Sequence, residues 1–427
     1  MLTLLVIAFV VLLATGIPIA FAMSGSALSA LVFRSNFPLD VFIQKTFSAG
    51  NSFSLLAIPF FVLAGELMTI SRLTDGLVTL CDALIGHIKS GLASASILAC
   101  MIFAGISGSG VADTAAIGSV VLPQLIAKGY PRGMAASLLA TAGALGPIIP
   151  PSILMIIYGS IAELSVGRLF LAGAVPGALM GLGFMAVAYV WNTKRGWEAG
   201  SATPFSLQRV GQSFRGAVLA LISPLIIIGG IVSGIFTATE AGVVAAVYGL
   251  FAALATRRIG LREIRAALVR SSLICTLPLF IIATASIFGW ILAVQHFPEM
   301  IQQLLMSVSL GNRYIAAALI LSFLVALGFF VEVISIMIIF TPILAPMAHT
   351  LGFDPIHWGL LIVVAINMGG VTPPVASQLY VAGSLAGCGL DEMSRYVFPF
   401  VGVMYAVLIL CLFVPDVAML VPRLVFR

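Results

Sequence analysis

Charged residues are scarce in this chain. Only 8% of its 427 residues are Asp, Glu, Lys or Arg, whereas 61% are hydrophobic. A water-soluble protein cannot bury that much apolar surface, so the composition indicates an all-α protein that crosses a membrane many times. At about 20 residues per crossing, the length predicts roughly ten to twelve spans.

Motifs for metal, redox or enzymatic chemistry are also lacking. The five cysteines are scattered without a CxxC pair, which favours buried free thiols. The four histidines fall near the expected ends of spans, where an interfacial position is favoured over metal binding. No nucleophile–base set or pair of metal ligands occurs in the apolar segments, which argues against a membrane enzyme. The five cysteines are Cys81, Cys100, Cys275, Cys388 and Cys411, and the four histidines are His87, His296, His349 and His357.

Basic residues concentrate in two short segments, and this placement reports orientation. Segment 192–215 holds four basic residues against Glu198, and segment 257–270 holds five against Glu263. Two spans, 216–236 and 239–256, separate them, so both segments lie on one side, which the positive-inside rule makes cytoplasmic. The second segment is interpreted as an interfacial helix on anionic headgroups, with a contact to another subunit as the alternative. The basic residues are Lys194, Arg195, Arg209 and Arg215, then Arg257, Arg258, Arg262, Arg265 and Arg270.

Two interruptions at 105–152 divide otherwise apolar sequence. The first reads GISGSGVADTAA from Gly105, and the second reads ATAGALGPIIPPS up to Ser152. Glycine and serine favour a turn in the first, and the prolines remove helical hydrogen bonds in the second. The arms at 92–104 and 115–126 are too short to span, which predicts a re-entrant hairpin. Residues 133–163 are predicted to form a discontinuous helix.

The second half of the chain repeats this order. Pro278 follows Pro59 at an offset of 219 residues (278 − 59), and the same offset places Glu332 opposite Asp113. A second hairpin is expected over 313–348 with its tip at 327–335, and a second broken helix over 357–387, interrupted at 367–374. The second Pro-Pro pair has an offset of 223 (373 − 150), which implies about four inserted residues. The copies are inverted if an odd number of crossings separates them.

The remaining apolar runs predict further spans. Residues 2–33 form either one kinked span or two short ones, because Gly16 and Pro18 interrupt them. Segment 71–89 is interpreted as an interfacial amphipathic helix. Spans are expected at 51–70, 169–191, 273–294 and 396–420.

A hairpin tip beside an unwound helix exposes carbonyls, hydroxyls and a carboxylate, which suit a small hard cation such as Na⁺. Nearby helix N-termini suit an anion. We therefore expect two Na⁺ sites and one anionic substrate site. The first Na⁺ set is Ser107, Gly108, Ser109, Asp113, Gly143 and Gly146, with Thr114 and Pro147 nearby. The second is Gly328, Glu332, Ser335, Gly369, Gly370 and Thr372. Ser109, Thr114, Glu332 and Asn367 are the expected substrate contacts.

Structural roles remain open for these residues. Gly-Ser runs in membrane helices often mark close helix packing. An ionisable residue in apolar surroundings is functional by default, yet Asp113 and Glu332 could instead cap the hairpins. Glu66 has no counterpart at offset 219, so a structural hydrogen bond inside the bundle is favoured for it.

Five motifs resemble the large membrane subunit of the TRAP (tripartite ATP-independent periplasmic) transporters. They begin at Ile58 (IPFFVLAGELM), Gly105 (GISGSGVADTAAIGS), Gly146 (GPIIPPS), Leu351 (LGFDPIHWG) and Met368 (MGGVTPP). The resemblance covers essentially the whole chain. It implies an elevator-type secondary transporter of the bacterial inner membrane, coupled to two or more Na⁺. It also implies a separate four-helix membrane subunit, a periplasmic substrate-binding protein, and an organic-acid substrate such as a C4-dicarboxylate or sialic acid.

The expected architecture is two repeats, each with a re-entrant hairpin and a discontinuous helix. The first scaffold segment is expected at 1–90, the two transport-domain halves at 91–165 and 313–390, the remaining scaffold at 166–312, and the C-terminal span at 391–427. The alternative function is an ion-translocating subunit of an energy-converting complex. Such subunits place lysines along their spans, where this chain has almost none.

Overall fold

Residues 1–34, 37–197, 204–256 and 259–426 are described by the computed structural model. Regular structure in these ranges is helical throughout. Seven helices here are long and apolar enough to cross a membrane, or eight if the bent pair α14–α15 counts as one. This count of single long helices is below the ten to twelve crossings that the length allows, because several apolar runs fold as helices of 10–17 residues. The seven are Phe53–Ile70, Gly110–Ala127, Val166–Arg195, Leu207–Val232, Ala238–Ala255, Leu261–Val294 and Leu390–Phe413.

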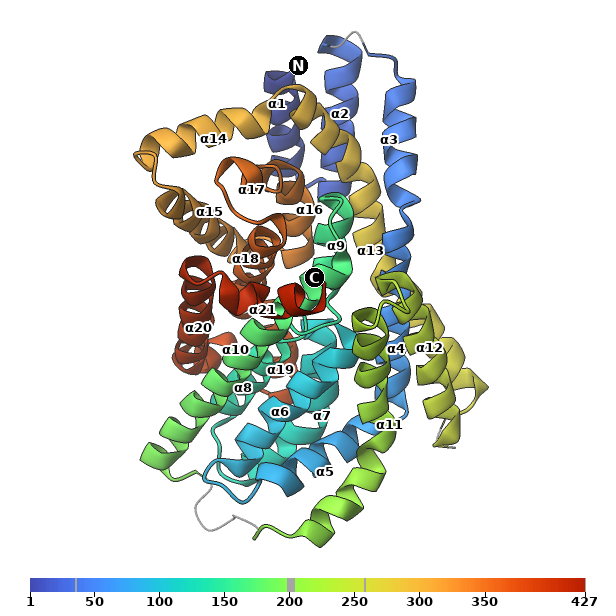
Figure 1. The fold of residues 1–427 in the computed structure, drawn as a ribbon, viewed down its shortest axis with the longest axis vertical. Helices are drawn as coiled ribbons and strands as arrows, with labels where there is room; N and C mark the ends of the chain where they lie inside the picture. Colours follow the sequence, from blue (N-terminus) through green and yellow to red (C-terminus); the bar gives the residue numbers. More distant parts are fainter. Residues whose placement is uncertain (35–36, 198–203, 257–258, 427) are drawn as a thin grey trace.

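The N-terminal run forms two short helices, α1 (Leu2–Ala14) and α2 (Ile19–Arg34), which pack together (Figure 1). Gly16, with φ +83°, separates them, so the second of the two readings of 2–33 is confirmed. The sequence did not predict α3 (Asp40–Gly50), which leads through the 3₁₀ turn η1 (Phe53–Leu56) into α4 (Ala57–Ile70).

Two amphipathic helices begin at sharp corners of the chain. A left-handed residue precedes each: Arg72, with φ +55°, before α5 (Leu73–Ile85), and His296, with φ +52°, before α14 (Phe297–Val308). A non-glycine residue with positive φ is uncommon, and here it lets the chain turn away from a long helix within one residue. The helix expected within 71–89 is thus present, whereas α14 was not predicted.

The first hairpin and the first broken helix are both present as helix pairs, but α7 alone is long and apolar enough to cross a membrane, so the re-entrant course of the hairpin stays a prediction. The hairpin arms are α6 (Gly91–Ser107) and α7 (Gly110–Ala127), so only Gly108 and Ser109 lie outside a helix. The arms are longer than predicted, since the Gly/Ser-rich sequence remains helical almost to the tip. The broken helix consists of α8 (Arg132–Gly143) and α9 (Ile153–Ile161).

Four long helices form the middle of the chain: α10 (Val166–Arg195), α11 (Leu207–Val232), α12 (Ala238–Ala255) and α13 (Leu261–Val294). Arg262, Arg265 and Arg270 lie on the first three turns of α13, which continues into the long apolar part without a break, so the basic segment is not a helix of its own; its contact with anionic headgroups stays a prediction. Glu198, Arg257 and Arg258 lie outside the described residues.

The second hairpin consists of α15 (Arg313–Gly328) and α16 (Val333–Leu344), followed by the single turn α17 (Met347–Thr350). The second broken helix is α18 (Pro355–Met368), the turn η2 (Gly369–Val371) and α19 (Ser377–Ala386). The chain ends in α20 (Leu390–Phe413) and α21 (Asp416–Val425).

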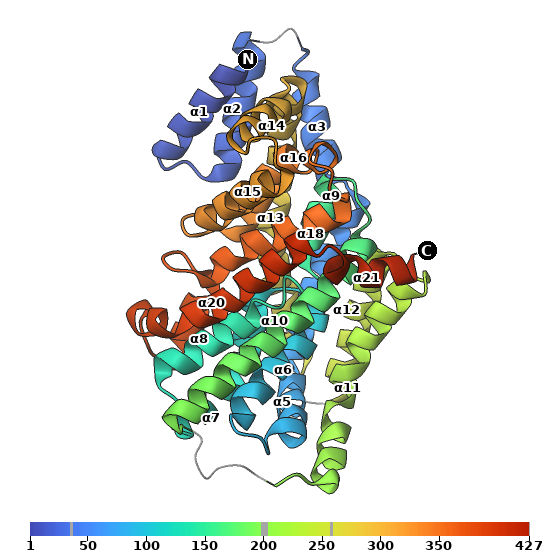
Figure 2. The same cartoon turned by 60° about the vertical axis from the view of Figure 1, so that its left-hand side comes forward.

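Helices from the two halves of the chain pack against one another at the centre of the molecule. Helix α19 packs on α7 and α8, while α9 packs on α16 and α18. Figures 1 and 2 show α11 and α12 on one side of the molecule, α8 and α20 on the other, the first hairpin between them and the second hairpin above. Large apolar side chains such as Phe33, Phe47 and Leu225 are 71–74% exposed on the outside, as expected of a surface that faces lipid.

Candidate functional site

The tip of the first hairpin touches the interruption in the first broken helix. Gly108 has φ +64°, and a Cβ there would approach the carbonyl oxygen of Pro151 to 2.5 Å, so only glycine fits. The amide of Ile153 donates to the Gly108 carbonyl at 3.2 Å. Ser109 caps the start of α7 by accepting from the amide of Ala112. The tip is therefore held against the start of α9.

Asp113 is fully buried in the first turn of α7. One carboxylate oxygen, Oδ1, accepts a hydrogen bond from the Ser107 hydroxyl. The other, Oδ2, has no hydrogen-bond partner in the described part of the chain. It faces Gly146 in the break, because a Cβ on Gly146 would collide with it. A buried carboxylate oxygen without a partner is costly unless something binds it.

The break between α8 and α9 supplies the opposite wall. A Cβ on Gly143 would collide with the Thr114 hydroxyl and lie 2.9 Å from the Gly110 carbonyl oxygen. Ser152 caps α9 by accepting from the amide of Met155 at 3.2 Å. Backbone and side-chain oxygens thus converge where the hairpin tip meets the break. The structure brings together all six residues of the first predicted Na⁺ set.

The residues of the second predicted Na⁺ set do not all meet at one place; they form separate local contacts. A Cβ on Gly328 would lie 2.6 Å from the Cα of Gly369, so the end of α15 rests on the second break. Glu332 caps α16, since its Oε2 accepts from the amide of Ser335 at 3.0 Å and from the hydroxyl of the same residue at 3.4 Å. Thr372 donates to the carbonyl of Met368. No hydrogen bond in the described residues joins Glu332 to the second break.

The residues of the two hairpin tips do not correspond in the way that the offset of 219 residues predicted. Glu332 is the N-cap of α16, the place that Ser109 takes in α7, at an offset of 223 (332 − 109). Asp113 lies four residues past that cap, where α16 has Ile336. Val375 donates to the Phe329 carbonyl at 3.2 Å, much as Ile153 donates to Gly108. The predicted equivalence of Asp113 and Glu332 is therefore wrong, because the inserted residues precede the tip.

Two buried amides join the halves of the chain. Asn367 donates through Nδ2 to the Ala144 carbonyl at 2.7 Å, and its Oδ1 has no partner in the described residues. Gln378 lies against Gly110 of the first hairpin and Gly370 of the second break, and its Oε1 is likewise unsatisfied. Gln378 was not among the residues predicted from the sequence. The available signal was a Ser-Gln pair two residues after the second Pro-Pro.

A central cavity of about 110 Å³ lies where these elements meet. Three of the four predicted substrate contacts, Ser109, Glu332 and Asn367, line this cavity. Thr114 does not line it and instead donates to the Gly110 carbonyl. Helices α4 and α13 close the other side through apolar residues. The lining also includes Gly108, Gly110, Pro147, Ser377 and Gln378, with Ile58 and Val62 of α4 and Ile274 and Pro278 of α13.

Other predicted residues lie elsewhere. Glu66 forms an ion pair with Arg270 at 3.3 Å, not the internal hydrogen bond that was favoured. His357 is buried and contacts the carbonyl of Cys411 through Nε2 at 2.8 Å, so its predicted interfacial position is wrong. Cys388 is partly exposed, and the other four cysteines are buried and free. No cluster of three or more His, Cys, Asp or Glu occurs among the described residues.

Residues 6–417 match the family model described as the tripartite ATP-independent periplasmic transporter, DctM component. The chain is 36% identical to the 2,3-diketo-L-gulonate TRAP transporter large permease of Escherichia coli, with 96% of each chain covered. It is 38% identical to the C4-dicarboxylate TRAP transporter large permease of Pseudomonas aeruginosa, covering 93% of this chain and 92% of that protein.

A third relative, the isethionate TRAP transporter permease of Oleidesulfovibrio alaskensis, is 37% identical over 96% of this chain. The chain spans 65% of that protein's length. The chain therefore belongs to the TRAP transporter large membrane subunits, and it is a multi-pass protein of the bacterial inner membrane.

The fold also resembles that of solved transporters. The Alcanivorax borkumensis YdaH transporter matches with a TM-score of 0.63 at 13% identity, covering 90% of this chain and 89% of that one. The Neisseria gonorrhoeae MtrF structure matches with a TM-score of 0.61 at 13% identity, covering 96% and 95%. At this identity the likeness supports the fold alone.

Proposed function

We propose that this subunit imports an organic acid by Na⁺-coupled symport. The observation that carries the proposal is the set of unsatisfied buried oxygens: Asp113 Oδ2, Asn367 Oδ1 and Gln378 Oε1. Asp113 and Asn367 both contact the first break, and Gln378 lies against Gly110 beside it. Oxygen ligands of this kind suit a hard cation, and a bound cation would also neutralise the buried carboxylate.

The first Na⁺ site, in this proposal, uses Asp113 with oxygens of the hairpin tip and of the first break. The second draws on Gly328, Gly369, Gly370 and Thr372, with Glu332 at the tip. Support for the second is weaker, because its side-chain oxygens already have partners. The helix starts at α7, α9 and α16 lie near the central cavity and suit the carboxylate of a substrate.

The substrate class proposed is a C4-dicarboxylate or a sugar acid such as sialic acid, which the names of several relatives include. A periplasmic binding protein would deliver it, and a small four-helix subunit would complete the membrane part. We further propose that the two halves are inverted repeats. The hairpins and broken helices at 91–165 and 313–390 would then move as an elevator against the scaffold at 1–90 and 166–312, with the C-terminal span at 391–427.

Uptake of a labelled organic acid into proteoliposomes, with both partners present, tests this proposal. Removing the Na⁺ gradient should abolish accumulation, and Asp113→Ala should do the same in protein that still assembles. Asp391→Asn is the matched control, because Asp391 is exposed at the start of α20. Uptake that persists without Na⁺ would refute the coupling. Normal uptake by Asp113→Ala would remove Asp113 from the site. The alternative of an ion-translocating subunit predicts no solute uptake at all.

A further inference from the structure

A second, larger cavity lies beside the central one. Its volume is about 910 Å³, in the range of ligand pockets, and we call it the outer cavity. Helix α3 and the C-terminal part of α13 form one wall, and α9, α16 and the loop after α9 form the other. Its polar lining is Lys45, Ser48, Ser52, Ser54, Ser160, Glu163, Ser165 and Ser286.

The two cavities follow one another along the same three helices. On α13 the central cavity is lined by 274 and 278, and the outer cavity by 282–293. On α16 the order is 333–334 then 338–342, and on α9 it is 153–154 then 159–161. Helix α13 starts at the basic, cytoplasmic end of the molecule. The outer cavity therefore lies on the periplasmic side of the central cavity.

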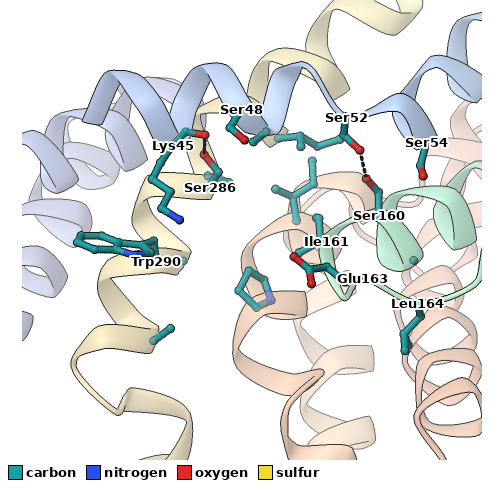
Figure 3. A pocket seen from close by; sticks show the side chains of 18 of the residues that line it. Lys45, Ser48, Ser52, Ser54, Ser160, Ile161, Glu163, Leu164, Ser286 and Trp290 are labelled. Carbon is teal, nitrogen blue, oxygen red and sulfur yellow. Dashed lines mark hydrogen bonds between the residues drawn. The ribbon is translucent and has the colours of Figure 1, made fainter. Parts of the chain in front are cut away.

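One cation and one anion face each other across the outer cavity. Lys45 reaches in from α3 over the ring of Trp290, at 5.9 Å from its centroid (Figure 3). Glu163 points in from the opposite wall. Neither side chain forms an ion pair in the described residues, so both charges are free to meet a ligand. Glu163 has φ +55°, a strained conformation for a non-glycine residue, which persists where the surrounding structure fixes it.

Serine hydroxyls surround the two charges. Ser286 donates to the carbonyl of Lys45 at 2.9 Å, and Ser52 bonds to Ser160 at 3.1 Å across the cavity walls. Ser48, Ser54 and Ser165 also line the cavity. Hydroxyls and a carboxylate accept hydrogen bonds from a polyol, while the single ammonium can bind only one anionic group. Glu163 would repel a second carboxylate.

We infer that the outer cavity binds the incoming substrate before the central cavity does, and that it selects a polyhydroxy acid with one negative charge over a dicarboxylate. The carboxylate would pair with Lys45, and the hydroxyls would bond to Glu163 and the serines. This inference rests on the proposed function, because it takes the central cavity to be the transport site.

Calorimetric titration of the full chain in lipid nanodiscs, with sodium gluconate and disodium succinate as probes, tests this selection. We expect gluconate to bind more tightly than succinate. Lys45→Gln should weaken gluconate binding about tenfold, and Glu163→Gln should shift the preference about tenfold towards succinate. Lys194→Gln, an exposed lysine at the end of α10, is the matched control and should change neither.

The same titrations in an Asp113→Ala background separate the two cavities. Gluconate binding that survives Asp113→Ala and still depends on Lys45 supports the outer cavity. Gluconate binding that is absent, weaker than that of succinate, or indifferent to Lys45→Gln overturns the inference. If Na⁺-dependent uptake is found while Lys45 has no effect, only this inference fails. If Lys45-dependent binding is found without Na⁺-dependent uptake, only the proposed function fails.

Discussion

Gly146 is the residue against which the free oxygen of Asp113 rests. A Cβ at this position would collide with Asp113 Oδ2 and lie 3.1 Å from the carbonyl carbon of Ser109. Both neighbours belong to the buried hairpin tip, which packs too tightly to give way. A single methyl group would therefore displace the carboxylate without changing any charge.

Gly146→Ala should lower Na⁺-dependent uptake about a hundredfold, since displacements of about 1 Å can have effects of that size. The matched control is Gly402→Ala in α20, where a new Cβ meets nothing within 4 Å. Uptake assays on equal amounts of assembled protein make the comparison. Equal uptake by the two variants would show that the contact between Gly146 and Asp113 does not matter for transport.

Helix α9 depends on a single side chain to begin in the right place. Ser152 is fully buried, accepts from the amide of Met155 and donates to the carbonyl of Pro147 at 2.5 Å. It therefore joins the start of α9 to the break before it. Removing its hydroxyl leaves a buried amide and a buried carbonyl without this partner.

Ser152→Ala should destabilise the protein by about 1–2 kcal/mol. Ser272→Ala is the control, because Ser272 is exposed and bonds only to the Leu268 carbonyl in its own helix; it should stay within about 0.5 kcal/mol. Thermal unfolding of the purified chain measures both. An equal shift for the two variants would show that the Ser152 cap contributes nothing specific.

The positions at which helices are interrupted could be predicted from the sequence more accurately than the ends of the hairpin arms. The prolines at 147, 150 and 151 exclude a helix by removing donors, wherever the segment packs. The ends of the hairpin arms were misplaced, because Gly105 and Ser107 tolerate a helix and packing decides their conformation. Helices α3 and α14 were missed, since neither is a long apolar run. Gln378 joined the candidate site only through the packing of α19 on α7, which no local pattern encodes.

A contact between two serines can report on movement between the two proposed parts of the molecule. Ser52 precedes η1, next to α4 of the scaffold, while Ser160 is on α9 of the first transport-domain half. Their hydroxyl oxygens are 3.1 Å apart, so the two side chains point at each other and a pair of cysteines there is a suitable cross-linking test. An elevator must separate these two residues in every cycle, whereas a rigid channel need not.

Ser52→Cys combined with Ser160→Cys should therefore form a cross-link under oxidising conditions and stop uptake. Reduction should restore it, because the bond only prevents movement. Each single-cysteine variant is a control, and the native cysteines interfere little, since four are buried. Proteoliposome uptake before and after reduction gives the measurement. Full uptake by the cross-linked protein would mean that α9 does not move against the scaffold at this point, and the elevator proposal would then fail for this half.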